Sequence, residues 1–200
     1  MDIRKAQYQT PSGTEFNFRD YYAYNIAAYR LDRLLDLNMM PPTVKRRVQG
    51  KPGALSWWID DLMMRDRERY QKKIPAPDPA KHNDQVYQVR VFNQLVYNND
   101  PNLTNVLIAN DWKVWIIDYT RAFRHNKNLK DKKDLVRIDR RIYNGLQALT
   151  EEILNRELGE YLNKAEIRAL LARRDRIVKY FDDQVAKKGE AAIICDLPGH

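Results

Sequence analysis

The chain has 200 residues, of which 44% are hydrophobic, so it is long enough to bury a core in one domain or in two lobes. Its formal net charge of +8 favours anionic partners such as nucleotides, nucleic acids or acidic lipid surfaces without choosing among them. The start "MDIRKAQ" has no apolar stretch, and nowhere do eighteen consecutive apolar residues occur, so we expect neither a signal peptide nor a membrane span. The single Cys195 cannot form an internal disulfide, so we expect a soluble, cytoplasmic protein with Cys195 as a small core residue.

The N-terminal part of the chain predicts one helix and one β-hairpin. Residues 1–19 are polar and show no hydrophobic period, so we expect no regular element there. Residues 20–37 place apolar side chains on one helical stripe, with Asp20 as N-cap, and "NMMPP" ends that helix. "TVKRRV" and "ALSWWI" are β-prone runs around the turn sequence "QGKPG", so we expect a hairpin over residues 43–59.

The middle of the chain alternates between helical and strand patterns. We expect a helix over residues 60–73, a break at "IPAPDPA", and a second helix over residues 82–97. Two short strands, 105–109 and 113–118, are then predicted around the turn "NDW".

The last part of the chain is predicted to be helical. One helix should begin after Thr150 and another after Asn163, where Glu166 completes a capping box, and the last long helix should end near Gly189. The order of elements indicates an α+β fold rather than repeated βαβ units.

The basic segment after the second short strand and the three histidines have ordinary structural explanations. Residues 121–141 hold nine Lys or Arg against three Asp, and we interpret this segment as a solvated connection, with a phosphate-binding patch as the alternative. Arg121 is expected to pair structurally with a carboxylate. His82, His125 and His200 show no metal-ligand spacing and are expected at the surface.

Three polar side chains within residues 97–124 suit phosphoryl transfer. Asp100 follows the helix predicted over residues 82–97. Asn105 begins the first of the two short strands, and Asp118 ends the second strand. All three can meet at one end of the hairpin. Transfer from a nucleotide requires a carboxylate that orients the attacking hydroxyl and oxygen ligands that hold Mg²⁺. These residue types therefore favour a nucleotide-dependent phosphotransferase.

The spacing from Asp100 to Asn105, and then through an apolar strand to Asp118, resembles the catalytic and metal-binding loops of the protein-kinase-like fold. The segments "NIAAYRLDRLLDLNMMPPTV", "ALSWW", "VFNQLVYNNDPNLTNVLI" and "WKVWIIDYTRAF" are similar to an atypical bacterial branch related to HipA-like and phosphatidylinositol-kinase-like enzymes. The resemblance covers residues 20–125 well and the helical remainder loosely.

This resemblance implies an α+β, kinase-like fold with a mostly helical C-lobe and a reduced or truncated N-lobe. The partial N-lobe would be residues 1–59, with a regulatory-type helix at 20–37 and the hairpin at 43–59. The C-lobe would be residues 60–200, with the catalytic and metal loops at 97–124.

The resemblance also implies roles for individual residues. Asp100 would be the catalytic acid/base or substrate-orienting carboxylate, and Asn105 and Asp118 would bind Mg²⁺. ATP would be the nucleotide, and the phospho-acceptor would be a hydroxyl group on an unidentified protein or small molecule. Three residues would form the hinge that meets the adenine: Trp57, Trp58 and Ile59.

The sequence departs from the kinase pattern at the phosphate-binding elements. Up to residue 50 only Gly13 and Gly50 occur, so no Gly-rich phosphate lid is found. Asn25 stands where a Glu would pair with a nucleotide-binding Lys, and Lys5 is the only lysine before residue 45. The alternative to an active enzyme is therefore a pseudokinase, or a nucleotide- or partner-binding module without turnover. A third alternative, a nucleic-acid-binding module that uses residues 121–141, is not favoured.

An EF-hand calcium loop is a further interpretation of the same stretch. Asp100, Asn102 and Thr104 occupy alternate positions, as EF-hand ligands do. The sixth position is Asn105 rather than Gly, and the twelfth is Asp111 rather than Glu, so this interpretation is rejected.

Overall fold

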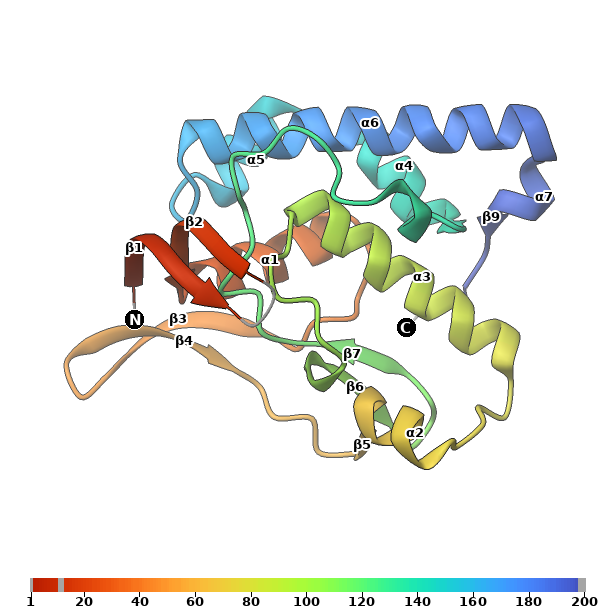
Figure 1. The fold of residues 1–200 in the computed structure, drawn as a ribbon, viewed down its shortest axis with the longest axis horizontal. Helices are drawn as coiled ribbons and strands as arrows, with labels where there is room; N and C mark the ends of the chain where they lie inside the picture. Colours follow the sequence, from red (N-terminus) through yellow and green to blue (C-terminus); the bar gives the residue numbers. More distant parts are fainter. Residues whose placement is uncertain (1, 11–12, 198–200) are drawn as a thin grey trace.

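Helices and small, mostly antiparallel sheets make up the chain, and its computed structural model describes residues 2–10 and 13–197. The long helix α6 (Lys164–Lys188) runs along one edge, and α3 (Pro79–Val96) lies beneath it in Figure 1. In the same view two N-terminal hairpins lie to the left and a three-stranded sheet lies below. Within the described residues, no helix is long and apolar enough to cross a membrane.

The first hairpin occupies a segment for which we expected no regular element, so that expectation was wrong. β1 (Asp2–Thr10) and β2 (Gly13–Tyr21) pair antiparallel, and residues 11–12, between them, are outside the described residues. Most of their side chains are exposed on both faces. The strands therefore lack the apolar alternation by which a half-buried strand is recognised. Asp20 lies in β2 and is not a helix N-cap.

The first helix is where the sequence predicts it, although it is shorter at both ends. α1 (Ala23–Leu34) follows Tyr22 directly and is buried along most of its length. It therefore forms a central element of the core. Its fully buried side chains include Ile26, Ala27 and Leu31.

The second hairpin is confirmed, with a shifted second strand. β3 (Thr43–Val48) pairs antiparallel with β4 (Lys51–Ser56). The expected strand over residues 54–59 ends earlier: the backbone N–H of Trp57 still donates to the carbonyl of Pro42 at 2.8 Å, but the paired residues end at Thr43 and Ser56.

The helix expected over residues 60–73 is only half correct. β5 (Leu62–Arg65) is a strand, and the helix α2 (Asp66–Lys72) begins after it. β5 pairs antiparallel with β6 (Val106–Ala109), which in turn pairs with β7 (Val114–Ile116). Pairing with a distant strand overrides the helical tendency of "DDLMMR".

Helix α3 begins three residues earlier than predicted. The Asp78 carboxylate accepts a hydrogen bond from the backbone N–H of Lys81 at 3.0 Å, and Pro79 occupies the first helical position, where its missing donor costs nothing. The helix ends at Tyr97, whose positive φ of 50° turns the chain into the next loop.

The C-terminal helices follow the predicted caps. α5 (Glu151–Leu158) begins after Thr150, and the side chain of Asn163 caps α6 while Glu166 completes the capping box. Glu166 Oε2 accepts from the backbone N–H of Asn163 at 2.8 Å, and α6 ends at Gly189. The remaining elements are η2 (Lys132–Asp134), β8 (Ile138–Asp139), α4 (Arg140–Ala148), α7 (Glu190–Ile193) and β9 (Ile194–Cys195), the last pairing in parallel with β8.

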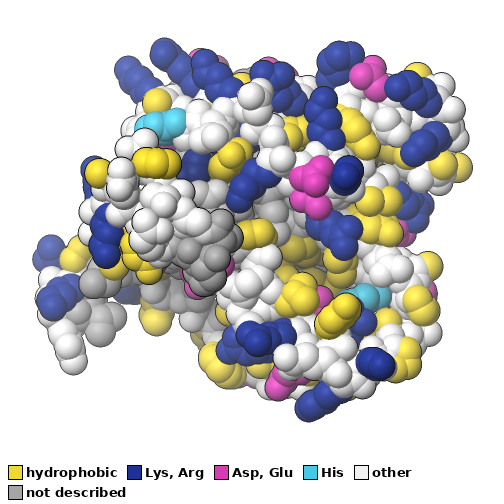
Figure 2. All heavy atoms as spheres, in the orientation of Figure 1, with side chains coloured by type: hydrophobic (Ala, Val, Ile, Leu, Met, Phe, Trp, Pro, Cys, Tyr) yellow, Lys and Arg dark blue, Asp and Glu magenta, His cyan; other side chains and the backbone are white. Residues whose placement is uncertain are grey.

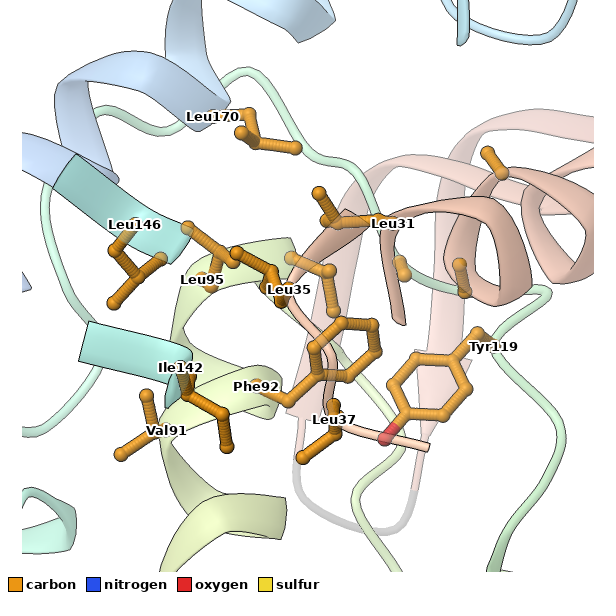
Figure 3. Close-up of a cluster of buried hydrophobic side chains, with 14 of the residues drawn as sticks. Leu31, Leu35, Leu37, Val91, Phe92, Leu95, Tyr119, Ile142, Leu146 and Leu170 are labelled. Carbon is orange, nitrogen blue, oxygen red and sulfur yellow. The ribbon is translucent and has the colours of Figure 1, made fainter. Parts of the chain in front are cut away.

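One hydrophobic core joins the helices to the loop after β7. Figure 3 shows Tyr119 beside Phe92 of α3, and their ring centroids are 5.2 Å apart with an edge-on geometry. Burial of such side chains is the main favourable term in folding. The loop after β7 is therefore fixed by the core. Other fully buried members are Leu31, Leu35, Leu95, Leu146 and Leu170.

A buried arginine ties α6 to the loops that flank α3 and β7. Arg173 is 0% exposed and donates to the carbonyls of Leu95 (2.7 Å), Arg124 (2.9 Å) and Asn126. Burial lowers the pKa of Arg173 to about 10, because no carboxylate compensates its lost hydration. Arg173 thus supplies the donors that three loop and helix-end carbonyls lack.

Replacing this arginine tests how strongly it holds the loops. Arg173→Met should lower the free energy of unfolding by about 3 kcal/mol, because buried carbonyls lose their donors. The control is Arg176→Met in the same helix, where an exposed arginine donates to Lys127, and the loss there should stay below about 1 kcal/mol. Urea denaturation measures both. Equal losses of unfolding free energy in the two variants would show that the buried hydrogen bonds of Arg173 stabilise the fold no more than the exposed one of Arg176.

The predictions of burial for Cys195 and of exposure for the three histidines have different outcomes. Cys195 is 5% exposed, as predicted for a small core residue, and burial raises the pKa of its thiol to about 12. His125 is exposed as expected, and His200 lies outside the described residues. His82 contradicts the prediction of a surface site: it is 4% exposed and packs edge-on against Trp112. Its position on the buried face of α3 overrides its polarity.

His82 makes stability sensitive to acid. Neither ring nitrogen has a protein hydrogen-bond partner, and burial, followed by the charge of Arg69, lowers the pKa of His82 below 6.5. The unfolded chain therefore binds this proton more readily, and stability is lost as pH falls below about 6.5. His82→Leu should have a melting temperature that declines less between pH 7 and pH 5 than the wild type. Parallel declines, followed by circular dichroism, would contradict this assignment.

Candidate functional site

Two loops meet where α3 and β7 end. The backbone N–H of Asn99 donates to the carbonyl of Arg121 at 3.2 Å, and the backbone N–H of Ile117 donates to the carbonyl of Asn105 at 3.0 Å. The first bond holds the beginning of the loop after α3, and the second holds its end. Both bonds join this loop to the segment that follows β7. Segments distant in sequence are thereby held side by side.

A cavity of about 510 Å³ lies between α2, α3, η1 (Leu103–Asn105) and β7. Such a volume suits a small ligand. Figure 2 shows hydrophobic side chains at the bottom of a hollow on the face viewed there. Asp100 and Asn105 both line the cavity, so the structure brings these two predicted site residues together. Its apolar lining includes Val86, Val89, Val106, Ile116 and Ile117.

The carboxylate of Asp100 is oriented but not tightly paired. The backbone N–H of Asp100 donates to Asn98 Oδ1 at 2.9 Å, and Asn102 Nδ2 donates to Asp100 Oδ1 at 3.2 Å. Asp100 Oδ2 has a long contact of 3.5 Å with Arg121 Nη1, and the side chain is 40% exposed. This oxygen can therefore accept a hydrogen bond from a hydroxyl group in the cavity.

The side chain of Asn105 has an unused hydrogen-bonding atom. Asn105 Nδ2 is buried and has no partner, although its backbone carbonyl is satisfied by Ile117. Buried polar groups in native proteins are nearly always paired, so this amide is available to a ligand. Rotation of the amide group by about 180° exchanges the positions of its oxygen and nitrogen, so either atom can be turned toward a ligand.

The third predicted residue, Asp118, is not brought into the cavity. Its side chain is exposed, whereas its neighbours Ile117 and Tyr119 both line the cavity. Thr120 Oγ1 donates to Asp118 Oδ1 at 3.0 Å, and Asp118 has a φ of 60°, in the left-handed region. Non-glycine residues are rarely held there, and such positions concentrate at functional sites.

Helix α1 holds the backbone beside Asp118. The Tyr119 N–H donates to Asn25 Oδ1 at 2.5 Å, and the Tyr21 N–H donates to the carbonyl of Thr120 at 2.9 Å. Asn25 is the residue found in place of the expected Glu. Its amide oxygen therefore positions the loop instead of neutralising a lysine.

Sequence reasoning missed a carboxylate that joins both loops to the first hairpin. Glu15 Oε1 accepts from Asn99 Nδ2 (2.8 Å) and Arg124 Nη2 (2.5 Å), and Glu15 Oε2 accepts from Arg121 Nη2 (2.5 Å). Burial opposes ionisation of Glu15, but the hydrogen bonds from Asn99 and Arg121 outweigh it and hold its pKa below the usual value. The predicted structural pairing of Arg121 is confirmed.

The predicted hinge residues lie outside the cavity that contains Asp100. Trp57 and Trp58 are 68% and 73% exposed, and Ile59 is buried. Exposed indole rings are unusual in a soluble domain and mark a surface that is available to a flat ligand or a partner.

Asn105 and Asp118 offer the types of donor that a hard divalent cation binds, but only Asn105 of the two lines the cavity. Within the described ranges, no group of three or more His, Cys, Asp and Glu side chains is arranged to hold a metal by itself. Mg²⁺ normally takes one or two carboxylates and completes its shell with waters and substrate phosphates. Oxygen ligands of that kind could come from Oδ1 of Asn105 and from the exposed carboxylate of Asp118.

Comparisons with known proteins establish the fold. No protein-family model and no curated protein matches the sequence. The structure of hydra Fam20 with sugar has a TM-score of 0.60 at 16% identity, covering 88% of this chain and 75% of that chain. The golgi casein kinase has a TM-score of 0.58 at 14% identity, covering 97% of this chain and 76% of that chain. The chain therefore has an α+β kinase-like fold similar to the Fam20 family kinases. The finer assignment to a bacterial HipA-like branch stays a prediction.

The contact between α1 and the loop after β7 can be tested at Asn25. Asn25→Ala leaves the Tyr119 N–H without an acceptor and should lower the free energy of unfolding by about 1 kcal/mol. Amide hydrogen exchange at Tyr119 should accelerate. Asn25→Asp retains an acceptor oxygen and is the matched control. Unchanged protection at Tyr119 in Asn25→Ala would refute the proposed role of Asn25.

Proposed function

We propose that the protein is a phosphotransferase that uses Mg²⁺ and ATP to phosphorylate a hydroxyl group on a protein or small molecule. The observation that carries this proposal is the cavity shared by the weakly paired carboxylate of Asp100 and the unpartnered amide of Asn105. These side chains occur in a kinase-like fold, at the spacing expected for a catalytic and a metal-binding residue.

Each predicted side chain has one role in this proposal. Asp100 orients the acceptor hydroxyl and takes its proton through Oδ2, the oxygen not engaged by Asn102. Asn105 and Asp118 are the residues that would hold Mg²⁺, which neutralises phosphate charge when bound. Asn25 keeps the backbone beside Asp118 in place.

The proposed N-lobe is residues 1–59, with residues 60–200 as the C-lobe. Two hairpins and α1 make up this N-lobe, and each hairpin pairs only with itself in the described part of the chain. Such a lobe is reduced relative to a full nucleotide clamp. The exposed rings of Trp57 and Trp58, followed by Ile59, are proposed to meet the adenine.

A pseudokinase is the second candidate, and two observations favour it. The exposed carboxylate of Asp118 does not line the cavity, and the amide oxygen of Asn25 is already bonded to Tyr119. Nucleic-acid binding by residues 121–141 is less consistent with the structure, because Arg121, Arg137 and Arg140 are paired with carboxylates. A cytoplasmic location remains a prediction from the single cysteine.

Substitution of the carboxylates separates turnover from binding. With Mg²⁺ and labelled ATP, Asp100→Asn should lose at least about 100-fold in phosphoryl transfer or hydrolysis but retain nucleotide binding. Asp118→Asn should lose both turnover and the Mg²⁺-dependent rise in melting temperature that ATP produces. The control is Asp111→Asn, in an exposed turn outside the cavity, where Asp111 Oδ1 accepts a hydrogen bond from the backbone N–H of Lys113.

Each outcome discriminates between the candidates. Binding of Mg²⁺ and ATP without any turnover in the wild type would establish the pseudokinase. Turnover that is unchanged in Asp100→Asn and Asp118→Asn would refute the proposed site.

A further inference from the structure

A compact group of charged and amide side chains lies beside Asp100 and has no part in the proposed chemistry. We call it the Glu15 cluster, and it consists of Glu15, Asn99, Arg121 and Arg124. Two guanidinium groups and one amide donate to the two oxygens of a single carboxylate, at 2.5, 2.5 and 2.8 Å. The side chains of Glu15, Arg121 and Arg124 are only 11–18% exposed. Charge-assisted bonds of this kind are strong and directional.

The donors of the cluster would suit a phosphate better than they suit a carboxylate. Arg121 and Arg124 carry two positive charges, and Glu15 supplies one negative charge. Among the described residues, the other carboxylate within ion-pair distance of these two arginines is that of Asp100, 3.5 Å from Arg121 Nη1. Lys130 adds another cation nearby, since its Nζ donates to Asn99 Oδ1 at 2.9 Å. Guanidinium forks match the oxygens of phosphate, and a dianion would balance this charge.

All three donors stand on backbone that does not depend on Glu15. Asn99 and Arg121 are joined by a backbone hydrogen bond of 3.2 Å. Arg124 Nη2 also donates to the carbonyl of Arg19 at 3.0 Å, and buried Arg173 holds the carbonyl of Arg124. The backbone that carries the donors is therefore held by contacts other than those to Glu15.

A route from solvent reaches the cluster. Asn99 and Arg124 line a second cavity, of about 630 Å³, between the first hairpin and the loop after β7. Cations attract anions into a cleft. Glu15 itself belongs to β2, whose strand partner within the described residues is β1, so its side chain is carried by a two-stranded hairpin outside the main core. Further cationic side chains in this second cavity are Arg4, Lys5 and Arg19.

We propose that Asn99, Arg121 and Arg124 form a phosphate-binding site beside Asp100, and that the carboxylate of Glu15 is its intramolecular occupant. A phosphate group from solution competes with Glu15 for the same donors. Because the site requires neither Mg²⁺ nor turnover, this inference goes beyond the proposed function and can fail independently of it.

The test removes the charge of the occupant and measures binding of inorganic pyrophosphate by calorimetry without Mg²⁺. Glu15→Gln should bind pyrophosphate at least about tenfold more tightly than the wild type, because the internal competitor is weakened. The matched control is Asp20→Asn, a half-buried acid in the same strand, which should bind as the wild type does. The double variant Glu15→Gln with Arg121→Gln should lose the gain.

The source of the phosphate is distinguished by competition in Glu15→Gln. Displacement of pyrophosphate by ADP with Mg²⁺, but not by glycerol phosphate, assigns the site to the nucleotide. The reverse result assigns it to a phosphate-bearing acceptor. An equal affinity of Glu15→Gln and wild type, or a gain that survives loss of Arg121, overturns the proposal.

A folding defect in Glu15→Gln does not remove the test. In that case wild type and Arg121→Gln are compared, both with Glu15 present. Pyrophosphate should raise the melting temperature of the wild type and not that of Arg121→Gln, since only a ligand of the folded state stabilises it. No rise in the wild type, or an equal rise in both proteins, overturns the proposal.

Discussion

The joining of the loop after α3 to the loop after β7 is the constraint on which the rest of the structure depends. Two backbone hydrogen bonds, from Asn99 to Arg121 and from Ile117 to Asn105, hold these segments together. The core reinforces them, because Tyr119 packs on Phe92 and Asn25 accepts from the Tyr119 N–H. If these contacts are lost, the residues proposed to act on phosphate have no common location.

This constraint also explains the use of charge in the interior. Arg173 is fully buried and unpaired by any carboxylate, yet it satisfies carbonyls at the end of α3 and after β7. Glu15 acts in the opposite sense, because its carboxylate accepts hydrogen bonds from side chains of both loops. Burial of a charged side chain is unfavourable unless its hydrogen bonds compensate for the lost hydration. Here those hydrogen bonds also hold the two loops in position. The same arrangement leaves Asp100 with one oxygen free of close partners.

The sequence predicted what is determined locally. The cap at Asn163 and Glu166 depends on residues three apart, and the α3 face depends on helical periodicity. The hairpin of β1 and β2 could not be predicted, because strands exposed on both sides carry no apolar alternation. β5 was mistaken for helix because its partner β6 lies more than forty residues away in the chain. The Glu15 cluster joins residues 84 to 109 positions apart, and no local pattern encodes such a contact. For the site, the sequence spacing correctly predicted that Asp100 and Asn105 lie together. It could not predict that the side chain of Asp118 is exposed and does not line the cavity.

We propose that Asn105 and Asp118 hold one divalent cation next to Asp100 when nucleotide is bound. The most direct measurement replaces Mg²⁺ by paramagnetic Mn²⁺ with ATP and follows the NMR signals of the protein. We expect selective broadening of the signals from Asn105 and Asp118, while signals from the β3–β4 turn, such as that of Gly50, stay unaffected. Broadening that spares both residues, or that is centred on other carboxylates, would contradict it.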